Sequence, residues 1–228
     1  VDLVPQAFTL DDNYNQSLAQ LGFVVINFAY RGSGPWRGRD FHTFGYGNLR
    51  DYALADDMAA IRQIAARYPC ADIERVGIYG HSGGGFMTVA AMLNHPEFYK
   101  VGVAASGNHD NNICSQWWGE TFHGVKQTWG KDGKPHFECH IPTNIELADR
   151  LAGRLLLITG DMDNNVHPAS TARLADALIR ARKRFDMTVI PGADHGLGNS
   201  YYVNLIRYYF TEHLLGLPQQ EIDIVKHN

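Results

Sequence analysis

The feature that most constrains the fold is the stretch Arg75 to Phe86, a short apolar run that breaks into glycine with Ser82 in the middle. A buried strand followed at once by G-x-S-x-G is the pattern of a nucleophile elbow, a sharp strand-to-helix turn that exposes a serine hydroxyl. Glycines around the serine allow the two backbones to approach closely and accept the angles of a tight turn. Because the helix-compatible run Phe86 to Leu93 follows, the pattern favours an elbow over a flexible glycine loop.

Length and charge narrow the function classes. The 228 residues suffice for one large α/β domain. A formal net charge of -4, without runs of like charge, gives no reason to expect nucleic acid or an anionic membrane as a partner. No apolar run approaches the roughly 18 residues of a membrane span, and no signal peptide is recognisable, although a first residue of Val1 leaves room for a natural start upstream.

Alternating apolar runs and helical patterns predict an α/β fold. Strands are predicted at 23–30, 75–79, 101–105, 155–159 and 187–190, and helices at 13–21, 48–68, 86–93, 169–184 and 200–215. This alternation implies a mostly parallel sheet with helices on both faces. Residues 106–153 lack sustained periodicity and are predicted to form an irregular excursion over the active site.

Polar residues follow the last two predicted strands. A serine nucleophile needs a general base and a third group that orients the base. Asp161 and Asp163 follow the fourth strand and His195 follows the fifth, which is the order serine, acid, histidine of α/β-hydrolases. We favour His195 over His167, which lies in the wrong loop for that order, whereas the residues alone leave Asp161 and Asp163 as alternatives.

Three ordered strings carry a family resemblance. GHSGGG with Arg31-Gly32-Ser33-Gly34 upstream, the string 163–167 (DNNVH) and the final Asp194-His195-Gly196 together resemble the catalytic domain of the prolyl oligopeptidase family, in its dipeptidyl peptidase IV-like branch. The resemblance spans about 23–215 and implies an α/β-hydrolase domain over 1–228. The roles that it implies are Ser82 as nucleophile, Asp163 as acid, His195 as base, the Gly83 amide as an oxyanion donor, Asn165 as a contact to the substrate carbonyl and Val166 as part of the substrate pocket.

The resemblance also implies parts that lie outside this sequence. The family's second oxyanion donor is a tyrosine in a loop after an earlier strand, but Tyr14 is the only tyrosine before Phe23 and falls in a predicted helix. We therefore expect the chain to begin inside the catalytic domain, without its first strands, with this donor and the family's β-propeller upstream of Val1. Residues 1–228 alone are then expected to be close to inactive, since loss of one donor typically costs about 100- to 1000-fold in turnover.

The expected substrate pocket departs from the family pattern. Alignment back from Glu120 and Gly124 places Asn111, Cys114 and Trp118 where the dipeptidyl branch has aromatic residues. A proline ring could stack on Trp118 and touch Val166, but a strict preference for proline is not expected. The alternative is that Trp117 and Trp118 are simply core residues.

Other polar groups receive simpler interpretations. Arg31 is expected to brace loops around the site, with direct substrate contact as the alternative, and Asp56 and Asp57 to be solvated or capping charges. The string 136–140 (HFECH) invites a metal interpretation with a partner such as His123, but zinc needs about four ligands and a solvated loop is favoured. No metal and no cofactor are expected, and Cys70, Cys114 and Cys139 form neither a CxxC pair nor an even set, which favours free thiols.

The sequence thus predicts a serine peptidase that acts on oligopeptides, with no nucleic acid or membrane partner and with a homodimer as one compatible assembly. A carboxylesterase or lipase of the same fold is the first alternative, because it would use the same triad. A catalytically silent binding module is the second. The Arg-Gly-Ser-Gly and Asp-Asn-Asn-Val-His strings favour the peptidase.

Overall fold

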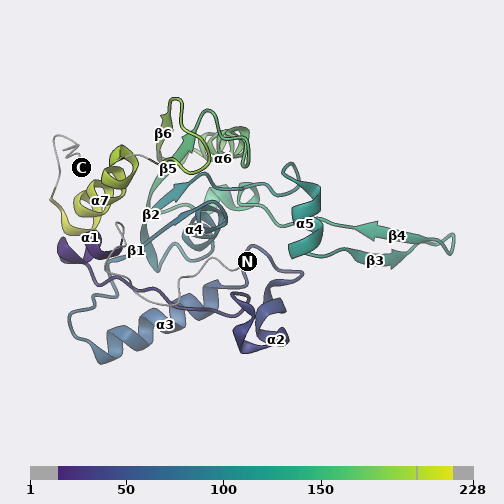
Figure 1. Cartoon of the computed structure of the whole chain (residues 1–228), viewed down its shortest axis with the longest axis horizontal. Helices are drawn as coiled ribbons and strands as arrows, with labels where there is room; N and C mark the ends of the chain where they lie inside the picture. Colours follow the sequence, from purple (N-terminus) through teal and green to yellow (C-terminus); the bar gives the residue numbers. More distant parts are fainter. Residues whose placement is uncertain (1–14, 199, 218–228) are drawn as a thin grey trace.

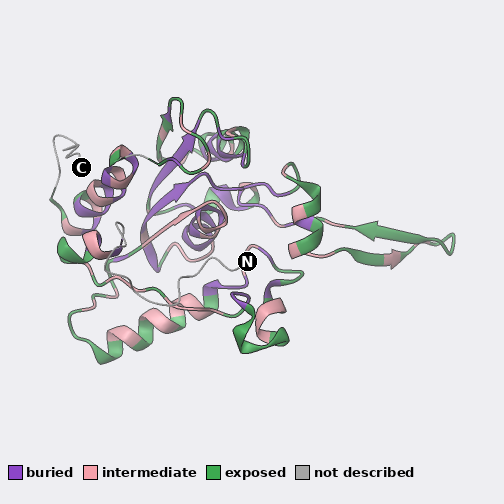
Figure 2. Cartoon of the chain, viewed as in Figure 1, coloured by how far each residue is buried: buried purple, intermediate pink, exposed green. Residues whose placement is uncertain are grey.

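A four-stranded parallel sheet forms the centre of the computed structural model, which describes residues 15–198 and 200–217 (Figure 1). Its strand order is β1 (Val76–His81), β2 (Tyr99–Ala105), β5 (Arg154–Gly160) and β6 (Asp186–Ile190). The two central strands, β2 and β5, are buried along nearly their whole length (Figure 2). Such burial is typical of parallel strands covered on both faces, and the α/β prediction is confirmed.

Side chains of the sheet alternate between two apolar clusters, one on each face. Leu155 and Leu157 pack in the cluster that includes residues of α3 (Leu54–Arg67), α4 (Gly83–Asn94) and α6 (Ala169–Arg180). Leu156 and Ile158 pack in the opposite cluster with residues of α1 (Asn15–Gln20) and α7 (Ser200–Leu215). The predicted helices therefore do cover both faces.

Some predicted limits need correction. Helix α3 begins at Leu54 rather than near Asn48, because 48–53 forms turns around the buried Tyr52. Helix α6 ends at Arg180, and Arg182 has a φ of 56°, a left-handed conformation that a helix cannot continue through. Helix α7 has the predicted limits.

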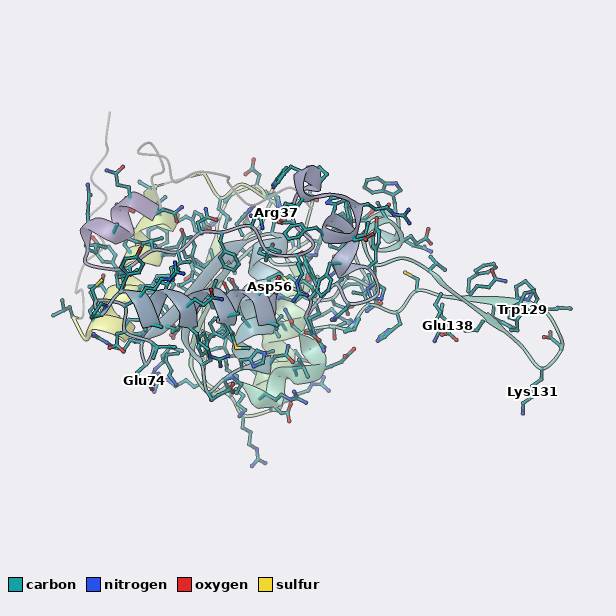
Figure 3. The ribbon with its side chains drawn as sticks, turned by 90° about the horizontal axis from the view of Figure 1, so that it is seen from below. Arg37, Asp56, Glu74, Trp129, Lys131 and Glu138 are labelled. Atoms are coloured by element: carbon teal, nitrogen blue, oxygen red, sulfur yellow. The ribbon has the colours of Figure 1, made fainter. Side chains whose placement is uncertain are left out.

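The excursion 106–153 is not irregular throughout, contrary to the prediction. It contains α5 (Gln116–Phe122), an antiparallel hairpin of β3 (Lys126–Trp129) and β4 (Pro135–Glu138), and the 3-10 helix η3 (Ile145–Arg150). These elements have four to seven residues, too few for a periodic pattern to stand out. The hairpin projects from the body as an arm, on which Trp129, Lys131 and Glu138 lie (Figure 3).

The predicted strand at 23–30 is wrong. The segment is extended, but it belongs to neither sheet, and the amides of Val24 to Tyr30 have no hydrogen-bond partner among the residues described. A cavity of about 370 Å³ lies between it and β1. Apolar, β-branched residues favour a strand, but a strand also needs a neighbour to pair with, which composition does not reveal. The loop that follows contains η1 (Pro35–Arg37), α2 (Arg39–His42) and η2 (Thr43–Gly45).

Two further observations bear on the sequence predictions. Cys70, Cys114 and Cys139 are free thiols, as predicted. Across 15–198 and 200–217, no helix combines the length and the apolar character that crossing a membrane would require.

Candidate active site

Ser82 lies at the turn between β1 and α4, in a strained backbone conformation. Its φ of 57° and ψ of -122° are unfavourable for a residue with a side chain. A Cβ atom at Gly80 would overlap the backbone of Gly84, so glycine is required where strand and helix meet. The Ser82 amide donates to the carbonyl of Ala105 at 2.8 Å, which ties the turn to β2. The sequence therefore forms the elbow that the G-x-S-x-G pattern predicts.

The structure brings Ser82, His195 and Asp163 into one hydrogen-bonded chain. Ser82 Oγ lies 3.0 Å from His195 Nε2, and His195 Nδ1 lies 2.8 Å from Asp163 Oδ2. A carboxylate only accepts hydrogen bonds, so Nδ1 carries the proton and Nε2 is left to accept from the serine hydroxyl. The three residues come from the carboxyl ends of β1, β5 and β6.

The carboxylate of Asp163 is buried and held on both oxygens. Its side chain is 0% exposed, and Oδ1 accepts the amides of Asn165 at 3.0 Å and Val166 at 2.8 Å. Asp161, in contrast, is exposed and accepts the Gly192 amide at 2.6 Å. Of the two aspartates that the sequence left open, the structure places Asp163 against His195.

His167 is also removed from the serine. It is exposed, and its Nδ1 accepts the amide of Ala169 at 3.1 Å.

The Gly83 amide stands at the first position of α4, next to Ser82, and makes no hydrogen bond within the described part of the chain. A free amide at a helix N-terminus can stabilise a developing negative charge.

Two residues that sequence reasoning missed contact the backbone of His195. His81 Nε2 lies 2.5 Å from the His195 carbonyl oxygen, to which Ser106 Oγ also donates at 3.3 Å. The two imidazole rings are 4.7 Å apart. His81 ends β1 and Ser106 follows β2, so their position directly at strand ends was the available signal. Burial lowers the pKa of His81, which favours a neutral ring beside His195.

The residues expected to form the substrate pocket are spread over different environments. Asn165 is exposed and Val166 is buried beside Asp163, while Cys114 is half-buried, and burial raises the pKa of its thiol. Asn111 is 2% exposed, and its Oδ1 accepts from Asn108 Nδ2 at 2.5 Å.

The two tryptophans differ in exposure. Trp118 is half-buried, lies 5.2 Å from the ring of Phe122 and packs against the cluster of Tyr52 and Ile141. Trp117 is 68% exposed, so the interpretation of both tryptophans as core is wrong for Trp117.

Arg31 is engaged by α3 and a neighbouring ring. Its guanidinium Nη2 lies 2.6 Å from Asp56 Oδ1, and the group sits 4.1 Å from the centre of the Phe44 ring. The guanidinium holds the pKa of Asp56 below its usual range. Asp57 accepts from the Tyr99 hydroxyl at 2.5 Å, and burial raises its pKa. Asp56 and Asp57 are therefore paired rather than simply solvated, Asp56 with Arg31 and Asp57 with Tyr99 of β2.

The string 136–140 is largely exposed, as predicted, but it is not a loop throughout, since 136–138 belong to β4. His136 lies 3.8 Å from Asp132, whereas His140 lies 3.4 Å from Glu146. Among the described residues, no three His, Cys, Asp or Glu side chains come together in a way that could hold a metal ion.

Nearly the whole chain matches one protein family. The model of the prolyl oligopeptidase family matches residues 9–217. The chain belongs to this family. Its sheet and helices are consistent with the α/β-hydrolase fold.

Individual members of the prolyl oligopeptidase family show the same relationship. Human dipeptidyl peptidase 8 is 28% identical over 203 residues, which cover 84% of this chain and 22% of the relative. The dipeptidyl peptidase family member 1 of Caenorhabditis elegans is 31% identical, over 83% of this chain and 23% of its own length. The crystal structure of Porphyromonas gingivalis dipeptidyl peptidase 4 superimposes with a TM-score of 0.62 at 28% identity, over 73% of this chain and 22% of that chain. The chain thus spans about a fifth of the length of these relatives.

Proposed function

We propose that residues 1–228 belong to the catalytic domain of a serine peptidase that hydrolyses peptide bonds of oligopeptides, in the manner of a dipeptidyl peptidase. The observation that carries the proposal is the hydrogen-bonded chain from Ser82 through His195 to Asp163. Family membership and relatives with dipeptidyl peptidase names support peptide as the substrate class.

The proposed reaction is acyl transfer to Ser82 followed by hydrolysis. Ser82 Oγ attacks the scissile carbonyl while His195 Nε2 takes its proton, and the Asp163 carboxylate stabilises the imidazolium that forms. The Gly83 amide donates to the oxygen that becomes negative. His195 then protonates the leaving amine, and water, activated by the same imidazole, hydrolyses the acyl-enzyme and restores the serine.

The same proposal also gives roles to residues around the triad. Val166 would line the pocket next to the acid, Asn165 would reach the substrate carbonyl, and Trp118 would offer a partly exposed ring. Arg31 acts as a brace, since Asp56 and Phe44 already engage its guanidinium. Asn111 acts through the buried packing that it shares with Asn108, and Cys114 contributes a half-buried wall.

The test is labelling and turnover in the complete gene product. A fluorophosphonate should label the protein, and dipeptidyl anilides should be cleaved faster than short-chain acyl esters. Ser82→Ala should abolish both activities, whereas Ser115→Ala, at an exposed serine, should leave them unchanged. Absence of labelling would contradict the serine mechanism, and cleavage of esters alone would assign an esterase instead.

A further inference from the structure

The arm formed by β3 and β4 has one apolar face and one polar face. Residues that pair directly across an antiparallel ladder point to the same side, and successive residues along a strand alternate. One face carries four uncharged side chains, two of them aromatic: Gln127, Trp129, Pro135 and Phe137. The other face carries two polar cross-strand pairs: Lys126 with Glu138, and Thr128 with His136. This is the pattern of a sheet that is covered on one side only.

The apolar face is uncovered in the described part of the chain. Trp129 is 69% exposed, Phe137 is 67% exposed, and every residue of β4 is exposed. The arm extends beyond α5, away from the central sheet and its layers of helices (Figure 1). A two-stranded hairpin is at best marginally stable alone in water, and neighbouring apolar side chains on an exposed face mark an interaction surface. We therefore expect this face to be covered in the working protein.

The tip of the arm is a defined turn. The Gly130 amide donates to the Lys134 carbonyl at 2.9 Å, and the Gly133 amide donates to the Gly130 carbonyl at 3.0 Å. Gly133 has a φ of 74°, a conformation that favours glycine. Because the charged residues Lys131 and Asp132 stand at the tip, the arm is poorly suited to end-on insertion into an apolar phase. The surface available for an apolar contact is the flat side of the arm.

A second copy of the same face fits this surface. In a two-fold contact a surface is its own partner. Trp129 and Phe137 are diagonal neighbours across the ladder, so a two-fold axis between them places Trp129 of each copy against Phe137 of the other. Because no charged side chain lies on this face, the contact brings no like charges together, and the pair of Lys126 and Glu138 stays on the side that faces water. Two stacked hairpins form two layers that cover each other.

The area of the aromatic rings indicates how strong such a contact is. A Trp or Phe side chain buries about 150 to 250 Å² when it is fully covered. With Trp129 at 69% and Phe137 at 67% exposure, the four rings of two copies would remove about 400 to 700 Å² from water, which is less than half of a standard interface of about 1,600 Å². The arms alone are therefore expected to give a weak dimer, which forms at micromolar concentrations.

We propose that the apolar face of the arm, with Trp129 and Phe137 at its centre, is a docking surface for the same face of a second copy, so that two molecules associate through a two-fold contact of their arms. The alternative occupant is another part of the same gene product, whose cover would not depend on protein concentration. Neither the face nor the contact depends on the proposed peptidase chemistry.

Oxidative footprinting of the complete gene product distinguishes these occupants. Mass spectrometry gives the rate at which hydroxyl radicals oxidise each ring, and sedimentation at the same concentrations gives the fraction of dimer. Trp129 and Phe137 should be oxidised about ten-fold more slowly in the dimer than in the monomer, whereas Trp36, a half-exposed ring outside the arm, should keep its rate. Protection already present in the monomer would assign the cover to the same polypeptide and overturn the proposal. Failure to dimerise, or equal oxidation of monomer and dimer, would also overturn it.

Charge substitutions compare the two faces of the arm in the complete gene product. Phe137→Lys places a charge on the apolar face and enters the two-fold contact twice, so the dissociation constant of the dimer should rise by about 100-fold or more. His136→Lys, at the adjacent residue on the polar face, is the matched control and should change this constant by less than about three-fold. An unchanged constant in Phe137→Lys would place the dimer contact elsewhere, and equal weakening by both substitutions would remove the distinction between the faces. Either result would overturn the proposal.

Discussion

The strand ends and the excursion 106–153 hold their residues in different ways. Ser82, Asp163 and His195 come from three strands of one sheet, and their contacts cross from one strand end to the next. The excursion carries short elements with exposed faces, as the 68% exposure of Trp117 and 69% of Trp129 show (Figure 2). Residues at the strand ends should therefore determine turnover, and residues of the excursion should mainly determine substrate affinity.

The largest expected effect comes from the buried acid at the strand ends. Asp163→Asn in the complete gene product should lower kcat by about 10⁴-fold, because an amide in that place no longer fixes the proton on His195 Nδ1. Steady-state kinetics on a dipeptidyl anilide measures the effect, with circular dichroism as a check on folding. Asp161→Asn is the matched control and should change kcat by a few-fold at most, since Asp161 is exposed and bonds Gly192. Similar losses in both variants would contradict the assignment.

Features that depend on local sequence could be predicted, whereas contacts between residues distant in sequence could not. Four of five predicted strands and the candidate triad come from patterns that are local in sequence: a buried apolar run, and a polar residue where the run ends. The role of 23–30 could not be predicted, because pairing depends on a neighbour that is distant in sequence. The hairpin of β3 and β4 was missed because four-residue strands give no periodic signal. The contact of His81 with the His195 carbonyl was missed because it joins residues 114 positions apart.

The next largest effect tests how the strand ends position the base. His81→Phe keeps a ring but removes the donor to the His195 carbonyl, and we expect kcat to fall by about 10- to 100-fold, equivalent to about 1.4 to 2.7 kcal/mol, with KM unchanged. His81→Gln retains a donor and should recover part of the loss. The acid limb of the pH profile should also shift, because a neighbouring imidazole that can become charged has been removed. An unchanged pH profile together with equal losses in both variants would indicate a merely structural role.

At His109, where the excursion leaves β2, burial should make the free energy of unfolding depend on pH. His109 is fully buried, accepts from Asn144 Nδ2 through Nδ1 at 3.1 Å, and burial lowers its pKa from 6.5 to about 3. The unfolded chain therefore binds this proton more readily than the folded chain does. The stability that the neutral His109 contributes is complete above pH 6.5 and is lost as the pH falls, by about 1.4 kcal/mol per pH unit. Between about pH 7 and pH 5, the free energy of unfolding should fall by about 2 kcal/mol less in His109→Gln than in the parent protein, as measured by urea unfolding. Equal acid sensitivity of the two proteins would contradict the buried neutral state.

The smallest effect should come from the excursion's half-buried tryptophan and should appear in affinity. Trp118→Ala is expected to raise KM for the preferred dipeptidyl anilide by about five-fold, roughly 1 kcal/mol, because a partly exposed ring contributes apolar contact rather than chemistry. The rate at which a small phosphonate labels Ser82 should not change, since the contacts of Ser82, His195 and Asp163 do not include Trp118. Trp117→Ala, at a ring that is 68% exposed, is the control and should alter neither value. If Trp118→Ala slowed labelling as much as it raised KM, the ring would instead support the strand ends through its packing near Tyr52 and Ile141. The division between turnover at the strand ends and affinity in the excursion would then fail at Trp118.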